Sequence, residues 1–331
     1  MNKIRTIEEA RKEIESLLIK TLYLKSNNSS SDYHPLRVMQ ALKSIMGLDV
    51  QMKVEPCLEW ANNFISEYQE IEKTRMASFP KTSFDFVSIQ NIYEAIKNKD
   101  EEKTLEEFEK LIIVSEGEHI MEFMLELSLQ QSGRSFGLVW SAYRTMKFCG
   151  KENLLQLYQT IVNCLLLDNF ENQKIEIENN FLPTKWFEQE LDNSFKQFEL
   201  VCHGQQIWSE KFIRRYSIKR SLTQFMSHRL DCNEIVKRSV FNNPIPTTVD
   251  KLIDTLDENK NNEIPDRIRY ISENMKRKWI LEFVQKKINR ITPRILLALD
   301  AYRTALKWTE KKHHGQVGIM LGNQLIEEWN A

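Results

Sequence analysis

The apolar residues of this chain recur at intervals of three and four positions in segment after segment, which is the spacing that lines one face of an α-helix. Only 9 glycines and 8 prolines occur in 331 residues, so few positions interrupt a helix or form a tight turn. We therefore expect an all-α fold of about a dozen helices in antiparallel pairs. A duplicated helical bundle and a short α-superhelix are the candidate architectures.

Start and stop signals divide the chain into predicted helices. Thr6 begins one of them, because Glu9 follows it with the spacing of a capping box. Pro293 begins another, since proline is favoured at the first helical position. Hydrophobic periodicity between such signals predicts helices at 6–25, 36–46, 55–76, 87–96, 104–114, 116–131, 133–148, 152–167, 186–202, 206–216, 221–240, 249–257, 264–291, 293–308 and 316–329.

The chain is expected to form two helical halves, 1–168 and 169–331, that pack together as one compact unit. The break between them is placed in the polar stretch from Asn169 to Thr184. Acidic residues outnumber basic ones from Met1 to Gln130, and the balance reverses from Gly204 to Arg294. The net charge of the whole chain is −1, which gives no overall reason to expect nucleic acid as a partner.

Two segments of the chain resemble each other, because 132–145 and 291–304 both end in Ala-Tyr-Arg-Thr. Their offset is close to half the chain length, so an internal duplication is one explanation. Convergence of two amphipathic helices on similar core faces is the other. We expect the centre of the core to contain Trp140, Tyr143, Ile161, Leu297 and Tyr302.

The repeated tetrapeptide places a phenol and a guanidinium at matched points of two helices. Such a pair can hold a carboxylate, a phosphate or a planar aromatic ligand. The alternative is structural: the rings pack in the core, and the arginines pair with internal carboxylates, for which Asp300 and Glu126 are candidates. The predicted ligand-binding residues are Tyr143, Arg144, Tyr302 and Arg303.

Two Glu-x-x-His segments are candidate metal sites, because this spacing puts both side chains on one helix face, as in di-iron helical bundles. The alternative is that these side chains lie on the surface or cap helices. No Walker loop, GxGxxG sequence, nucleophile elbow or Ser-His-Asp order is present, so no cofactor is evident beyond this di-iron option. The predicted metal ligands are Glu116, His119, Glu310 and His313.

His34 precedes Pro35 at the start of the predicted helix 36–46 and is the candidate catalytic residue. This segment and the helices at 133–146 and 291–306 resemble the layout of the all-α questin-oxidase-like family. Two motif histidines of that family are absent, where this chain has Ser132-Gly133 and Asn289-Arg290, so only His34 carries over. The resemblance implies oxidation of a polycyclic aromatic metabolite without an obvious cofactor-binding motif.

Three functions are compatible with these features. The first is binding of a small hydrophobic or aromatic molecule in an interhelical pocket, with an oxidoreductase reaction on it as the resemblance implies. The second is a non-catalytic helical scaffold that binds a protein partner. The third, which the small net charge disfavours, is binding of nucleic acid or another polyanion through the basic runs at 211–220 and 276–278.

The cysteines and the hydropathy of the chain bear on its compartment. The 5 cysteines are widely spaced and form neither a CxxC nor a zinc-finger pattern, which indicates reduced thiols. No apolar run approaches the length of about 18 residues that a membrane helix needs, and the first residues lack a signal-peptide core. We expect a cytoplasmic protein with no membrane partner.

Overall fold

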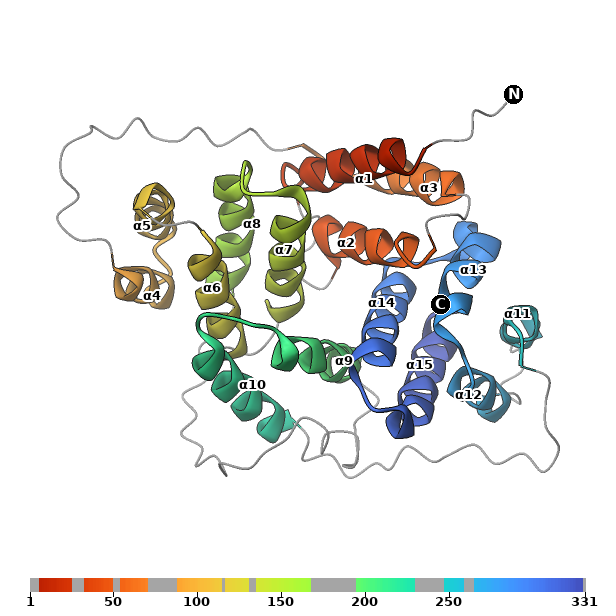
Figure 1. Ribbon diagram of the computed structural model, residues 1–331. Helices are drawn as coiled ribbons and strands as arrows, with labels where there is room; N and C mark the ends of the chain where they lie inside the picture. Colours follow the sequence, from red (N-terminus) through yellow and green to blue (C-terminus); the bar gives the residue numbers. More distant parts are fainter. Residues whose placement is uncertain are drawn as a thin grey trace. The chain divides into compact units, whose positions relative to one another are not determined.

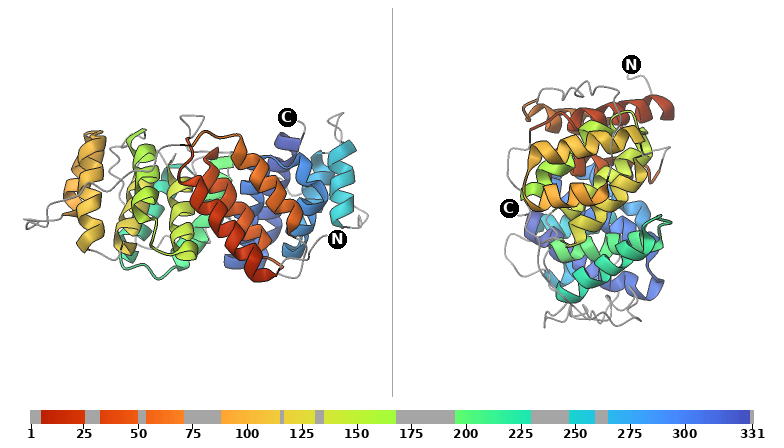
Figure 2. Two further views of the ribbon diagram at one scale, coloured as in Figure 1. Left: turned by 90° about the horizontal axis from the view of Figure 1, so that it is seen from above. Right: turned by 90° about the vertical axis from the view of Figure 1, so that its left-hand side faces the viewer.

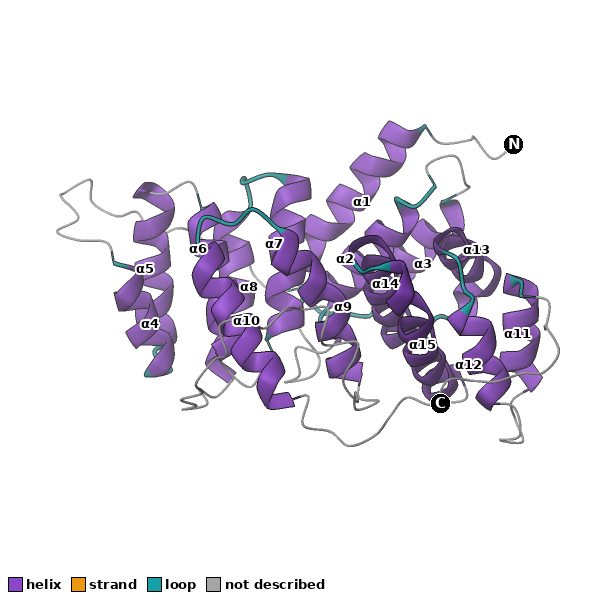
Figure 3. Cartoon of the chain, turned by 60° about the horizontal axis from the view of Figure 1, so that its bottom comes forward, coloured by secondary structure: helices purple, strands orange, loops and turns teal. Residues whose placement is uncertain are grey.

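The computed structural model describes residues 6–25, 33–49, 54–70, 88–114, 117–130, 135–167, 195–229, 247–258 and 265–329. Helices account for 84% of these residues. The described ranges contain no sheet, only an isolated antiparallel bridge between Leu24 and Glu70 (Figure 3). The predicted all-α fold is therefore confirmed. None of the described helices is long and apolar enough to cross a membrane.

Figure 1 labels the α-helices of the described ranges. In chain order they are α1 (Ile7–Thr21), α2 (Pro35–Met46), α3 (Glu55–Ser66), α4 (Ile89–Lys97), α5 (Glu101–Val114), α6 (Glu118–Gln130), α7 (Phe136–Cys149), α8 (Leu154–Leu167), α9 (Phe195–Ser209), α10 (Arg215–Arg229), α11 (Val249–Glu258), α12 (Pro265–Glu273), α13 (Arg277–Lys287), the 3₁₀ helix η4 (Ile288–Arg290), α14 (Pro293–Trp308), the 3₁₀ helix η5 (Lys311–His313) and α15 (His314–Trp329).

Local sequence sets where several of these helices begin. At α1, Thr6 Oγ1 accepts from the backbone N–H of Glu9 at 3.1 Å, and Glu9 Oε2 accepts from the backbone N–H of Thr6 at 2.8 Å. This is the predicted capping box. At α14, Thr292 Oγ1 accepts from the N–H of Ile295, and Pro293 occupies the first position. Both helices begin where the sequence predicts.

The chain gathers into two compact units, and neither is a contiguous half of it. The predicted boundary between halves, Asn169 to Thr184, lies outside the described residues, so the division at residue 168 stays a prediction. The first unit comprises Met1–Gln40, Ala61–Ile175 and Lys211–Leu222, and the second comprises Ala41–Trp60, Glu176–Glu210 and Thr223–Ala331.

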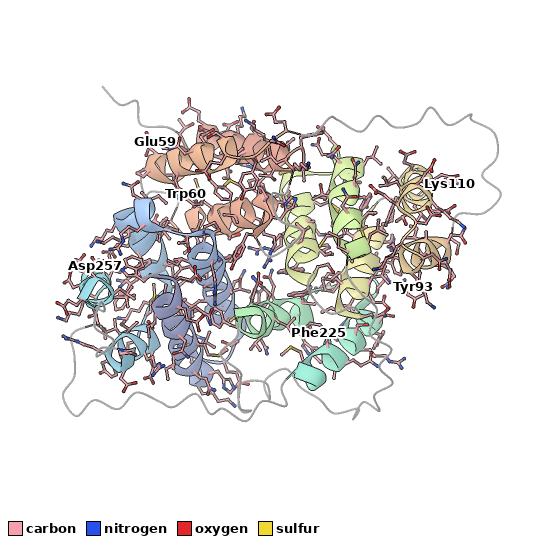
Figure 4. All side chains as sticks on the ribbon, turned by 180° about the vertical axis from the view of Figure 1, so that it is seen from behind. Glu59, Trp60, Tyr93, Lys110, Phe225 and Asp257 are labelled. Atoms are coloured by element: carbon pink, nitrogen blue, oxygen red, sulfur yellow. The ribbon has the colours of Figure 1, made fainter. Side chains whose placement is uncertain are left out.

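In the first unit, α7 packs against α1, α6 and α8, and α5 packs against α4 and α8. The buried Tyr158 of α8 stacks on Phe108 of α5, with ring centroids 5.3 Å apart. Its hydroxyl donates to the carbonyl of Gly117, just before α6, at 2.7 Å. Tyr158 thereby joins three helices. The neighbouring pair α4 and α5 is golden in Figure 2, and Figure 4 labels Tyr93 and Lys110 on it.

In the second unit, α14 packs against α9, α13 and α15, and α12 packs against α15. Gly318 permits the contact of α12 with α15, because a Cβ added there would lie 2.4 Å from the carbonyl oxygen of Ser272. Gly322 follows one turn later, and its added Cβ would lie 3.1 Å from the Cα of Arg269. The two backbones therefore approach more closely than a side chain at Gly318 would allow.

Asp257 at the end of α11, labelled in Figure 4, contacts three other elements of the second unit. Its carboxylate accepts from Lys287 Nζ at 2.9 Å and from the indole N–H of Trp329 at 3.1 Å, and it pairs with Arg290. The Arg290 guanidinium also covers the Trp329 ring, 4.7 Å from its centroid. Burial raises the pKa of Asp257, but the hydrogen bonds from Lys287 and Trp329 hold it below its ordinary value. The carboxylate is therefore charged, and its contacts hold α11 against α13 and α15.

Several predicted helix boundaries are wrong. The sequence predicts separate helices at 186–202 and 206–216, yet α9 continues through 203–209, and the break falls at 210–214. The next helix begins at Arg215, ahead of its predicted start at Ser221. The predicted single helix 264–291 is divided at 274–276, where the carbonyl of Met275 accepts from the Tyr302 hydroxyl at 2.7 Å. Contacts with distant segments accompany both breaks, and hydrophobic periodicity carries no information about such contacts.

The predicted burial of the core residues is confirmed. All of the residues expected at the centre of the core are buried, with Ile161 and Tyr302 completely inaccessible to solvent. The described cysteines, Cys57, Cys149, Cys164 and Cys202, are free thiols. Hydrophobic periodicity was therefore sufficient to identify which helix faces are covered.

Candidate ligand site in the first unit

The first unit contains a solvent-open cavity of about 660 Å³. Its wall comes from the starts of α4 and α6, from the end of α5, and from the segment that leads into α10. The residues that line it are Ser88, Ile89, Leu111, His119, Ile213, Arg214 and Ser217. Three of them are apolar and four carry hydrogen-bonding side chains, which is the mixed lining typical of small-molecule sites.

Helix α6 fixes the α10 side of this cavity through Glu122. Oε1 of Glu122 accepts from the backbone N–H of Ile213 at 3.2 Å, and Oε2 accepts from that of Arg214 at 2.8 Å. Glu122 is buried, so its charge depends on these donors and on the positive end of α10. The start of α10 is therefore held by a side chain about ninety positions earlier in the sequence.

A second carboxylate of α6, one turn further along, holds the side chain of Arg214. Glu126 Oε2 accepts from Nε of Arg214 at 2.9 Å and from Nη2 at 2.7 Å. The guanidinium also lies over the Phe123 ring, 5.3 Å from its centroid. Gln130 donates to the other Glu126 oxygen at 3.3 Å. Arg214 thus reaches the cavity with its orientation set by an ion pair and an aromatic ring.

Several polar atoms of the cavity wall have no hydrogen-bond partner in the described part of the chain. Among the described residues, nothing accepts from Nη1 of Arg214, and neither His119 nor Ser217 makes a side-chain hydrogen bond. Ser88 accepts from the N–H of Gln90 at 3.1 Å, which leaves its hydroxyl proton available. The lining therefore presents several donors to whatever enters the cavity.

The basic run 211–220 continues from this wall onto the surface. Tyr216 is 90% exposed and Ile213 is 64% exposed, whereas Phe212 is buried. Burial and the neighbouring charge of Arg215 lower the pKa of Lys219. The segment 211–220 thus combines exposed apolar groups with several cations.

The two Tyr-Arg pairs lie elsewhere in the fold. Tyr143 is buried, stacks on Trp140 with centroids 5.5 Å apart, and meets Phe212 edge-on at 5.4 Å. It therefore packs behind the segment that forms the cavity wall. In the second unit, Arg303 pairs with the buried Asp300 at 2.8 Å. Asp300 is thus the internal partner of one repeated arginine, whereas Glu126 pairs with Arg214.

Neither pair lines the cavity of the first unit. Tyr143 and Arg144 belong to the first unit, and Tyr302 and Arg303 belong to the second. A pocket shared by the two repeated helices therefore stays a prediction.

His34 begins α2 as its N-terminal cap. Its Nδ1 accepts from the backbone N–H of Leu36 at 3.2 Å, which requires that nitrogen to be unprotonated. Burial, together with the charge of Arg37, lowers the pKa of His34 to about 4. The Arg37 side chain is buried against Gly137 of α7, where an added Cβ would lie 2.3 Å from Nη2. His34 does not line the cavity, and its catalytic role stays a prediction.

The structure describes three of the four candidate metal ligands. In the described part of the chain, no group of three or more His, Cys, Asp or Glu side chains is placed to hold a metal ion. Glu310 is an exposed residue that pairs with Lys312 at 3.1 Å, and His313 is buried. Glu116 lies outside the described residues. Of the three described candidates, His119 is the one that lines the cavity.

The fold and this cavity define the chain as an all-α protein with a candidate small-molecule site between helices. No family model matches the chain, and no curated protein and no solved structure matches it significantly. The resemblance to the questin-oxidase-like family therefore stays a prediction.

Sequence reasoning identified two members of this lining, for different reasons. His119 was singled out as a metal ligand, and Arg214 as one cation of the basic run 211–220. The remaining members, Ser88, Ile89, Leu111, Ile213 and Ser217, are ordinary residues at helix ends, and no motif marks them. Their common feature is position in three dimensions, which a linear pattern does not record.

Proposed function

We propose that this protein binds a small molecule in the cavity of the first unit. The observation that carries the proposal is a cavity of about 660 Å³ whose wall presents unused hydrogen-bond donors. Sites for small ligands typically measure about 300–1,000 Å³ and combine apolar walls with a few oriented polar groups. Ile89, Leu111 and Ile213 supply the apolar contacts, which suits a hydrophobic or aromatic molecule.

His119 is the candidate proton carrier if the bound molecule is transformed. Of the described residues that line the cavity, it alone carries an imidazole, the side chain most often used to accept and donate protons in catalysis. In a catalytic version of this proposal, the protein oxidises an aromatic metabolite, as the family resemblance implies. Exchange of His119 for Gln distinguishes catalysis from binding alone, because turnover would be lost while the other lining residues still bind the molecule.

The test of binding is to fill the cavity. Ser217→Phe places an aromatic ring in the lining, and 2-naphthol serves as a neutral aromatic probe followed by isothermal titration calorimetry. We expect the affinity for 2-naphthol to fall at least about tenfold, which corresponds to about 1.4 kcal/mol. Ser66→Phe is the matched control, since Ser66 is an exposed residue of α3 outside the cavity. Equal affinity in the two variants would contradict the proposed site.

Docking of an anionic macromolecule is a second candidate function. The exposed Tyr216 and Ile213 beside the cations of 211–220 favour it, because exposed aromatic and basic groups together suit such partners. Retention on heparin in a salt gradient tests it. We expect Arg215→Gln with Arg220→Gln to elute at lower salt than the unmodified protein. Unchanged elution, together with specific binding of 2-naphthol, would contradict the docking function and favour small-molecule binding.

A further inference from the structure

On the basis of this proposed function, we infer that the ligand of the cavity carries an anionic group, a carboxylate or a phosphate, and that Arg214 binds it. The shared chemistry is a planar or tetrahedral oxyanion attached to an apolar body. Among the described residues that line the cavity, Arg214 carries the one permanent charge, and none has a carboxylate.

The geometry of Arg214 leaves one edge of its guanidinium open. A guanidinium has five N–H donors arranged as a planar fork, and two neighbouring nitrogens can bind one oxyanion together. Glu126 occupies the edge formed by Nε and Nη2. The edge formed by Nη1 and Nη2 has no acceptor on Nη1 among the described residues. A carboxylate or phosphate fits that edge in the bidentate manner.

The protein holds Arg214 in place before any ligand arrives. Phe123 supports one face of the guanidinium, Glu126 binds one edge, and Glu122 fixes the backbone N–H of the same residue. The side chain is 29% exposed, so it is restrained and still reachable. Restraint of a long side chain reduces the entropy lost on binding, which is the usual property of a recognition group.

Other groups of the cavity are suited to the same anion. Ser217, Ser88 and His119 can all donate hydrogen bonds into the cavity. Arg215 and Lys219 follow on α10 and add positive potential, and the crowding of these two cations contributes to the lowered pKa of Lys219. The nearby acids, Glu122 and Glu126, are both engaged by donors of the protein.

Two variants of the ion pair between Arg214 and Glu126 test this inference. Both lose the ion pair, but their expected effects on the affinity for an anionic ligand are opposite. Arg214→Gln and Glu126→Gln each remove one charge of the same pair. The first removes the anion-binding fork. The second releases the arginine from its internal counter-charge and makes it a stronger anion site.

The experiment compares 2-naphthoate and 2-naphthyl phosphate with neutral 2-naphthol, by isothermal titration calorimetry on the full chain. In the unmodified protein we expect at least one of the anions to bind about tenfold tighter than 2-naphthol, the factor that a charged hydrogen bond supplies. Arg214→Gln should remove that preference, and Glu126→Gln should increase it. In Arg214→Gln, binding of 2-naphthol should fall less than binding of the anions, because the neutral probe lacks the oxyanion that the guanidinium holds. Whichever anion shows the larger preference identifies the head group.

Three outcomes decide the inference. Equal affinity for the anions and for 2-naphthol overturns it and leaves the proposed function standing. A fall in anion affinity in both variants also overturns it, because the ion pair would then serve only the fold. Absence of binding by all three probes overturns the proposed function together with the inference. If Arg214→Gln fails to fold, as judged by circular dichroism, Arg214→Lys replaces it: the charge remains, the fork is lost, and the anion preference should fall.

Discussion

Oε2 of Glu122 accepts a hydrogen bond from the backbone N–H of Arg214, at 2.8 Å from the nitrogen. The same carboxylate accepts the neighbouring N–H of Ile213, so one buried side chain of α6 satisfies two backbone donors just before α10. No Ser, Thr, Asp or Asn stands at this helix start to do so locally. The contact therefore decides both where α10 begins and where one wall of the cavity lies.

Replacement of Glu122 should loosen the start of α10. Glu122→Ala leaves the N–H groups of Ile213 and Arg214 without their acceptor, and we expect a loss of about 1–3 kcal/mol in the free energy of unfolding. Glu122→Gln keeps one oxygen acceptor and should lose less. Urea denaturation followed by circular dichroism measures both. Equal stability of the alanine variant and the unmodified protein would contradict this role.

The stability of the protein should depend on the protonation of His34. Its pKa is about 4 in the folded protein against an ordinary value of 6.5, so the unfolded chain binds more protons between these values. The contribution of His34 is fully present above pH 6.5 and is lost as the pH falls towards 4. We expect a loss of about 2 kcal/mol between pH 7 and pH 5 from this residue.

His34→Asn is the control for this pH dependence. Asparagine is a good N-terminal cap and does not titrate, so the variant should keep α2 and lose the His34 part of the pH dependence. Denaturation midpoints at pH 5, 6 and 7 in both proteins give the difference. Parallel curves would show that His34 does not titrate as the buried cap requires.

Alanine at Gly318 should disturb the packing of α12 on α15. The new Cβ would meet backbone atoms of Ser272 and Glu273, which cannot turn away as a side chain can. We expect a loss of about 3 kcal/mol, the upper end of the usual range for overpacking. Gly322→Ala should cost less, because its closest contacts are longer, and Gly47→Ala should cost least, because its added Cβ meets only ordinary contacts. A different order of melting temperatures would disprove this account of the glycines.

Truncation of Ile161 should reveal a tightly packed centre in the first unit. This side chain is completely buried in α8, so Ile161→Ala should cost about 2–5 kcal/mol. Ile7→Ala is the matched control, since Ile7 is 60% exposed and its loss should cost less than about 0.5 kcal/mol. Thermal denaturation of the two variants tests the difference. Similar melting temperatures would contradict the assignment of Ile161 to the core.

Removal of Arg303 should affect stability and not the cavity. Asp300 is 2% exposed, and Arg303→Met removes the cation that pairs with this buried carboxylate, so we expect a loss of about 3–5 kcal/mol. Binding of 2-naphthol to the folded variant should be unchanged, because Arg303 does not line the cavity. Weakened binding by Arg303→Met and by Arg144→Met alike would instead favour a ligand site at the repeated Tyr-Arg pairs.

The sequence by itself determined the all-α class, most helix positions and the burial of the core residues. These properties are local: apolar residues at helical spacing select a face, and caps such as Thr6 and Thr292 fix a start within one turn. The repeated tetrapeptide also predicted two buried tyrosines correctly. The pairing of Arg303 with Asp300 is also local, since the two residues lie three positions apart on one helix. The partner of the other candidate acid, Glu126, is Arg214, which lies 88 positions away and which the sequence did not indicate.

Tertiary structure decided the breaks at 210–214 and 274–276 and the place of the candidate site. Arg214 became a cavity residue because Glu122 and Glu126 of α6 bind its backbone and its side chain across about ninety positions of sequence. His34 became a helix cap with a low pKa because burial beside Arg37 penalises a second positive charge. Hydrogen bonds and charge interactions depend on distance in space, and the fold alone sets that distance for residues far apart in the chain.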